Sequence, residues 1–278
     1  MASARRSKTG NRRTSRRLFA TVDDAAPRPG LAIPTRWLNN FLAYLLLPVA
    51  GVLSVSFFTC FREAAAAHDA FWITEEFYFF SLGAIVWLIA FFGGKWACGE
   101  PRPLRVYVFG HELTHALWVW LMGGRVMNFE VRRDGGHIIT DKSNFLIALA
   151  PYFYPIYSIA VLVLYRLVTA FYIFPYSIPI LFGLLGFTLS FHFSFTIWMI
   201  PKGQTDLTHN GRFFSWIVIF TMNVLLLSLV LIIAVPDVTF LGFGKELLRN
   251  AEEFSHWVLT TVLGDRLHRW RLPGLNQR

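Results

Sequence analysis

The stretch of sequence that decides the fold is residues 106–122, VYVFGHELTHALWVWLM. It is apolar almost throughout, and its length is close to the roughly 20 residues that a helix needs to cross a bilayer. Within it, His111 and His115 are four residues apart, so a helix carries both imidazoles on one face. With Glu112 directly after the first histidine, this is the HExxH pattern, in which two histidines hold Zn2+ and the glutamate is a general base.

The apolar surroundings strengthen this interpretation. Ionisable side chains are costly at membrane depth, so their presence there indicates a functional site. The alternative is a pair of buried histidines that only form hydrogen bonds to neighbouring helices. Motif and context together favour a metal site, with zinc as the metal.

The composition is typical of a membrane protein. Of the 278 residues, 55% are hydrophobic and only 15% are charged, and the mean hydropathy is +0.47. A soluble domain of this length carries more charge. The two cysteines, Cys60 and Cys98, provide neither a disulfide framework nor a CxxC metal site.

Hydropathy predicts an all-α polytopic membrane protein with about six transmembrane helices. The predicted spans are residues 38–58, 77–92, 104–122, 144–164, 178–200 and 213–235. They form a membrane core, residues 37–236, between two terminal segments. Residues 1–36 form a basic tail that we expect to be disordered and cytoplasmic. Residues 237–278 contain an amphipathic, interfacial helix with Leu247, Ala251, Phe254, Val258 and Val262 on one face.

The distribution of charge predicts the orientation and the partners. Arginine and lysine are crowded in the first tail and recur after the last span, so both termini are expected in the cytoplasm of a multi-pass protein of the cell or inner membrane. The basic loop after the HExxH helix, with Arg125, Arg132 and Arg133, argues against this topology. The first tail should attract anionic lipid headgroups, and no nucleic-acid partner is expected.

A short β-hairpin is predicted directly after the HExxH helix. Residues 126–131 alternate as a strand does, Asp134 to Gly136 form a turn signal, and residues 137–140 form a return strand. An unpaired edge of this hairpin could bind an extended peptide by strand addition. The alternative is a plain connecting hairpin.

The HExxH motif in a membrane helix, followed by Gly-Gly-Arg-Val at 123–126 and a hairpin, resembles the site-2 protease family of intramembrane zinc metalloproteases. The resemblance covers mainly residues 104–212. It implies that His111 and His115 are zinc ligands, that Glu112 is the catalytic base, and that a downstream aspartate is the third ligand.

Two residues compete for the place of that third ligand. Asp206 is the only acidic residue between Asn144 and Gly211, although Leu207 follows it where the family has a glycine. His192 lies within the fifth predicted span, at a depth similar to that of His115 in its own span at about 1.5 Å per residue. His192 and Asn223 are also candidates for contacts with the substrate or with its oxyanion.

The leading hypothesis is therefore a zinc metalloendopeptidase that hydrolyses membrane-embedded protein or peptide substrates by a zinc-activated water. A prenyl-protein-processing type of metalloprotease is less favoured, because its third ligand is a downstream glutamate and no glutamate occurs between Glu130 and Glu246. The remaining alternative is a non-enzymatic or catalytically inactive membrane protein, such as a metal carrier, a channel subunit or a scaffold.

Overall fold

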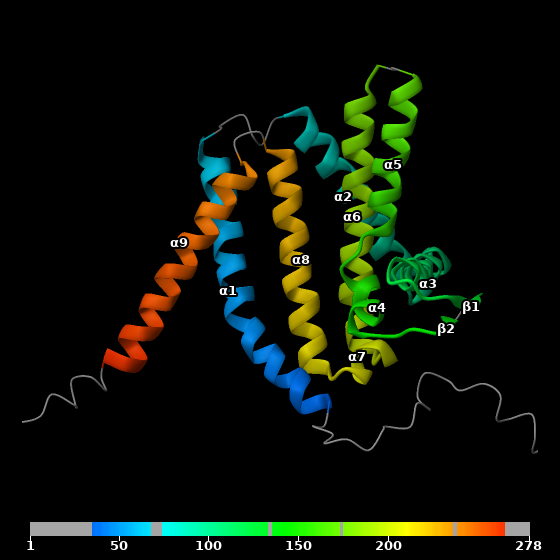
Figure 1. Cartoon of the computed structure of the whole chain (residues 1–278). Coiled ribbons are helices and arrows are strands. Elements are labelled where there is room, and N and C mark those ends of the chain that lie inside the picture. The colour runs from blue at the N-terminus through cyan, green and yellow to red at the C-terminus, as the bar shows by residue number, and fades with distance from the viewer. Residues whose placement is uncertain (1–34, 68–73, 133–134, 173–174, 236–237, 265–278) are drawn as a thin grey trace, which may run out of the picture.

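The described part of the chain is mostly helical, with one short β-hairpin (Figure 1). This computed structural model describes residues 35–67, 74–132, 135–172, 175–235 and 238–264. The elements in chain order are α1 (Thr35–Ala67), α2 (Glu75–Cys98), α3 (Leu104–Leu121), β1 (Val126–Val131), β2 (Gly136–Thr140), α4 (Phe145–Leu149), η3 (Ala150–Tyr152), α5 (Ile156–Phe171), α6 (Ser177–Met199), η4 (Ile200–Lys202), α7 (Thr205–His209), α8 (Arg212–Ala234), α9 (Phe240–Val258) and η5 (Leu259–Gly264). The predicted basic tail lies outside the described residues, apart from its last two.

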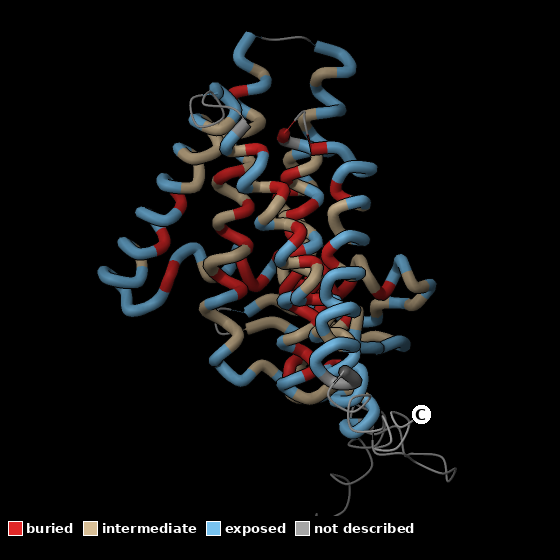
Figure 2. The backbone as a smooth tube through the Cα atoms, turned by 90° about the vertical axis from the view of Figure 1, so that its left-hand side faces the viewer, coloured by how far each residue is buried: buried red, intermediate tan, exposed pale blue. Residues whose placement is uncertain are grey.

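Four described helices, α1, α2, α6 and α8, are long and apolar enough to cross a membrane. A fifth crossing is added if α4 with η3 and α5 are counted as one broken span. Figure 2 shows that buried residues gather inside the bundle while exposed residues cover its outside, where large apolar side chains include Trp37, Phe58, Ile89 and Ile233. Such a surface is typical of contact with lipid. The expected helical architecture is therefore confirmed, and the apolar helices are consistent with an integral membrane protein, whereas the count of six spans and the side of each terminus stay predictions.

Helix α3, which carries the HExxH motif, is not among these four candidate spans. In Figure 1 it is seen nearly end-on, whereas α1, α6 and α8 run along the page, so α3 lies across the bundle. Neighbouring elements bury part of its surface, with Val108, Ala116 and Val119 among its buried residues, while Phe109 and Trp120 are exposed. Hydropathy does not distinguish a helix buried in protein from one that faces lipid. The similar membrane depths expected for His115 and His192 assumed that their helices run side by side across the bilayer. Because α3 lies across the bundle, that comparison of depths does not hold.

Two prolines break the predicted fourth span. Pro151 lies within η3 and Pro155 directly precedes α5, and the chain bends by 76° between the two helical parts. Proline lacks the backbone N–H that would continue a helix. The break leaves α4 and η3 at the end of the bundle where α7 also lies (Figure 1).

Two apolar clusters fix the elements that meet at this end. One joins α2 and α6 to α3 and includes Trp87, Phe91 and Phe195, with the Tyr107 ring stacked on Phe195 at a centroid distance of 4.4 Å. The other joins α1, α4, η3, α7 and α8 and includes Leu149 and Leu207. The first cluster therefore positions α3, and the second positions α7.

Glycines allow α2 and α6 to pack with their backbones almost in contact. A Cβ atom on Gly83 would overlap the carbonyl oxygen of Gly183, and one on Gly186 would overlap the carbonyl oxygen of Phe80. Small residues at such crossings let helices in a membrane approach closely. Trp87 Nε1 also donates to Ser194 Oγ at 2.8 Å across this contact.

The first part of the C-terminal helix α9 packs on α1, and the rest of α9 diverges from it (Figure 1). Phe243 and Leu247 contact the cluster shared by α1, α8 and α9, and Asn250 Nδ2 donates to Ser56 Oγ of α1 at 3.1 Å. Part of the apolar face of α9 therefore packs against α1. The predicted interfacial position stays a prediction, and the Val262 side chain lies outside the described residues.

The close contact of α2 and α6 gives a test of the fold. Gly83→Ala should lower the free energy of unfolding by about 1–3 kcal/mol, because the methyl group forces the two backbones apart. Gly93→Ala, also in α2, is the matched control, since a Cβ there has no heavy atom within 4 Å. Denaturant-induced unfolding in detergent measures both. Equal stability of the two variants would contradict the packing described.

Candidate metal centre

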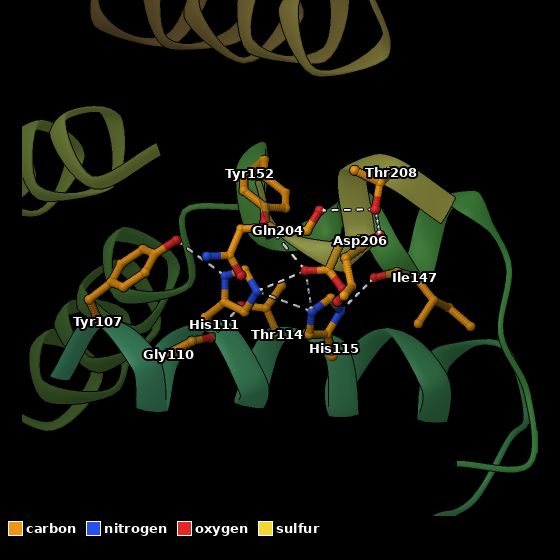
Figure 3. Close-up of polar contacts among 11 residues, drawn as sticks. Tyr107, Gly110, His111, Thr114, His115, Ile147, Tyr152, Gln204, Asp206 and Thr208 are labelled. Carbon is orange, nitrogen blue, oxygen red and sulfur yellow. Dashed lines mark hydrogen bonds and ion pairs between the residues drawn. The ribbon is translucent and has the colours of Figure 1, made fainter. Parts of the chain in front are cut away.

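Side chains from two distant parts of the chain, His111 and His115 of α3 and Asp206 of α7, meet at one point (Figure 3). His111 Nε2 lies 3.2 Å from His115 Nε2 and 3.2 Å from Asp206 Oδ2. His115 Nε2 lies 3.5 Å from the same carboxylate oxygen. The two imidazoles are 8% and 9% exposed and the carboxylate 24%. Within the described residues, they form a group of three that could hold a metal ion.

Local structure explains how each side chain reaches this point. The two histidines are one helical turn apart on α3, so they project from one face. Asp206 lies in the first turn of the short helix α7, and the next residue, Leu207, is buried in the cluster below it. Ser215 Oγ of α8 donates to the Leu207 carbonyl at 3.0 Å and helps to fix α7.

The other nitrogen of each imidazole has a partner of its own. His115 Nδ1 lies 2.8 Å from the carbonyl oxygen of Ile147 in α4, and His111 Nδ1 lies 3.2 Å from the Tyr107 hydroxyl. With Nδ1 donating to these oxygens, both Nε2 lone pairs are directed at the centre. Histidines that bind metals usually donate their second ring N–H in this way. The Tyr152 hydroxyl donates to Asp206 Oδ2 at 3.3 Å.

The separations of the three atoms fit a tetrahedral metal ion. Nitrogen and oxygen atoms that each lie about 2.0–2.2 Å from such an ion lie about 3.3–3.6 Å from one another. The observed separations of 3.2, 3.2 and 3.5 Å are close to this range. Three protein ligands would also leave a fourth position for another molecule.

Glu112 lies next to the first histidine and is buried, at 6% exposure. It is within electrostatic range of both His115 and Asp206. A carboxylate beside a three-ligand metal centre can accept a proton from a molecule in the open position. The structure therefore brings the predicted base next to the predicted ligands.

His192 is not part of the group of three, although it lies nearby. Together with His111 it lines a small cavity whose other walls include Thr188, Phe191 and Tyr157. Its side chain is buried, and among the described residues its Nε2 atom has no hydrogen-bond partner. Of the two competing third ligands, the geometry favours Asp206.

Asn223, in α8, is held by the protein itself. Its Nδ2 atom donates to the Tyr152 carbonyl at 2.9 Å and to the Ile219 carbonyl at 2.8 Å. Both amide protons are thereby used, so the side chain has no donor left for a substrate carbonyl. Its contact instead joins α8 to the segment that carries Tyr152.

Sequence reasoning missed three groups that surround the ligands. Tyr107 could have been found, because it lies four residues before His111 on the same helical face. Tyr152 lies next to Pro151, and a tyrosine beside a break in a helix indicates a ligand partner less clearly than the spacing of Tyr107 does. The Ile147 carbonyl has no sequence signal, since any residue type provides it.

Comparisons of the chain with models of known protein families, with curated proteins and with solved structures find no match.

The geometry predicts which variants lose a bound metal. His111→Ala, His115→Ala and Asp206→Ala should each abolish the binding of about one metal ion per chain, because a ligand is removed. His192→Ala should keep it, and so should His209→Ala, which changes an exposed histidine on the same short helix as Asp206. Elemental analysis of the purified, folded variants gives the result. Loss of metal in His192→Ala but not in Asp206→Ala would show that the ligand set is wrong.

Proposed function

We propose that this protein is an intramembrane zinc metalloprotease that hydrolyses peptide bonds of membrane-embedded substrates. The observation that carries the proposal is the buried meeting of His111, His115 and Asp206, with Glu112 beside them. The apolar helices around this centre support a substrate that is itself within the membrane. The proposal agrees with the resemblance to the site-2 protease family.

Zinc is the metal that suits these ligands best. Two imidazole nitrogens and one carboxylate oxygen, with a fourth position open, form a common catalytic zinc site. The side chains of Cys60 and Cys98 lie outside the group of three, so a thiolate-rich site is not formed there. When bound, zinc would polarise a peptide carbonyl and make a water molecule more acidic.

The chain itself would supply the movement of protons. The Glu112 carboxylate would accept a proton from the attacking water and then donate it to the nitrogen of the leaving amine. Asp206 would stay ionised as a ligand, with the Tyr152 hydroxyl donating to it. Tyr107 and the Ile147 carbonyl would keep both imidazoles in the orientation that ligation requires.

The space beside His111 supports access for a substrate group. The cavity there is walled mainly by apolar and aromatic side chains, including Pro151, Ile156 and Phe191. Burial in such surroundings excludes bulk water and strengthens electrostatic interactions with a reacting carbonyl. His192 also faces this cavity, so it stays a candidate for contact with a substrate oxygen.

The test is the loss of the proposed base without loss of the metal. Glu112→Gln should retain about one zinc per chain but lower cleavage by roughly 100-fold or more, since the amide cannot accept the proton. The probe is a panel of single-span model proteins reconstituted with the enzyme in vesicles, with cleavage read by mass spectrometry. Glu252→Gln, an exposed position on α9, is the matched control and should cleave like the parent.

Two outcomes would contradict the proposal. One is cleavage by Glu112→Gln at the rate of the parent. The other is a parent protein that binds zinc in a folded state and cleaves no member of the panel, which would favour a metal carrier or a catalytically inactive protein.

A further inference from the structure

The β-hairpin lies along α3, with its turn end next to Glu112. Val131 and Gly136 face each other as the last pair of the register before the turn, and Phe129 of β1 contacts Phe109 of α3 at a centroid distance of 6.0 Å. At the other end, Lys142 Nζ donates to the Met122 carbonyl at 3.0 Å, just after the end of α3. The Arg125 N–H donates to Asp141 Oδ1 at 2.6 Å and so joins the two ends of the hairpin to each other. The hairpin is therefore attached to α3 along its length.

At its turn end, the backbone of Gly136 packs directly on the Glu112 side chain. A Cβ atom added to Gly136 would lie 2.5 Å from Glu112 Cγ, 2.9 Å from Cδ and 2.9 Å from Oε1. Real Cβ atoms do not approach other carbon atoms this closely, so a side chain at 136 requires the Glu112 side chain to shift. The φ angle of Gly136 does not lie in the left-handed region. The effect of a side chain at 136 is therefore one of space around Glu112 and not one of backbone strain.

Contact with the hairpin also limits the position of the carboxylate. Among the described residues, Glu112 has no hydrogen-bond or ion-pair partner that would hold its oxygens. A side chain without such a partner is positioned by the groups that pack on it. Because the close atoms belong to the far end of the Glu112 side chain, a larger residue at 136 would displace the carboxylate rather than the helix.

We propose that Gly136 is a positioning residue for Glu112: the strand backbone forms a wall that holds the carboxylate beside the metal centre. The inference deepens the proposed function and rests on it for the role of Glu112 as a base. The hairpin then affects the reaction itself, because a shift of β2 moves the backbone that packs on the Glu112 side chain. A plain connecting hairpin would have no such effect.

The first experiment compares Gly136→Ala with the parent. We expect kcat for the best-cleaved model substrate to fall about tenfold or more, because small misplacements of a reacting group have large effects. KM should change less than about twofold, and zinc content should stay at about one per chain. Gly51→Ala is the control, since a Cβ there has no heavy atom within 4 Å. Parent-like kcat in Gly136→Ala would overturn the inference.

The second experiment does not depend on cleavage. Co2+ is added to the metal-free protein, and its visible absorption spectrum reports the surroundings of the ion. Gly136→Ala should change this spectrum when Glu112 is present and should leave it unchanged in the Glu112→Ala background. The same spectral change in both backgrounds would show that Gly136 acts through another group and would overturn the inference.

The pair of experiments separates the two proposals. A parent that cleaves nothing, with the cobalt coupling intact, contradicts the protease alone. Cleavage by the parent, with no coupling between residues 112 and 136, contradicts this inference alone. If Gly136→Ala does not fold, the Glu112→Ala/Gly136→Ala double variant decides: recovery of folding supports the contact, and failure to recover overturns it.

Discussion

The burial of two imidazoles and one carboxylate inside an apolar helix bundle is the constraint on which the rest of the structure depends. Buried polar groups are stable only with partners, and here several elements supply them. Helix α4 contributes the Ile147 carbonyl, η3 contributes the Tyr152 hydroxyl, and α7 contributes Asp206. The break at Pro151 and Pro155 places α4 and η3 against α3, and these two elements supply the Ile147 carbonyl and the Tyr152 hydroxyl.

The bundle around the centre consists of two packed groups that meet at this end. Aromatic side chains and closely packed glycines join α2, α6 and α3, whereas a separate apolar cluster joins α1, α4, α7 and α8. The histidines belong to the first group and Asp206 to the second, so the metal centre lies where the groups join. A bound ion would therefore link them, since the free energy of metal binding stabilises the folded arrangement of its ligands.

Much of this could be predicted from residues alone, and the failures have physical causes. The positions of the long helices and of the hairpin follow from hydropathy and alternation, and the spacing of His111 and His115 places them on one face. The orientation of α3 could not be predicted, because a helix that packs against protein and a helix that faces lipid contain the same kinds of apolar residue. The choice between Asp206 and His192 depended on that orientation. The contact of Gly136 with Glu112 could not be predicted either, because it depends on how the hairpin folds back on α3.

X-ray absorption at the zinc edge of the purified protein in detergent tests the central claim most directly. The account predicts two imidazole nitrogens and oxygen ligands at about 2.0–2.2 Å with no sulfur, and loss of this signal in Asp206→Ala. A sulfur ligand at about 2.3 Å, or a spectrum that Asp206→Ala leaves unchanged, would show that the metal is not held by His111, His115 and Asp206.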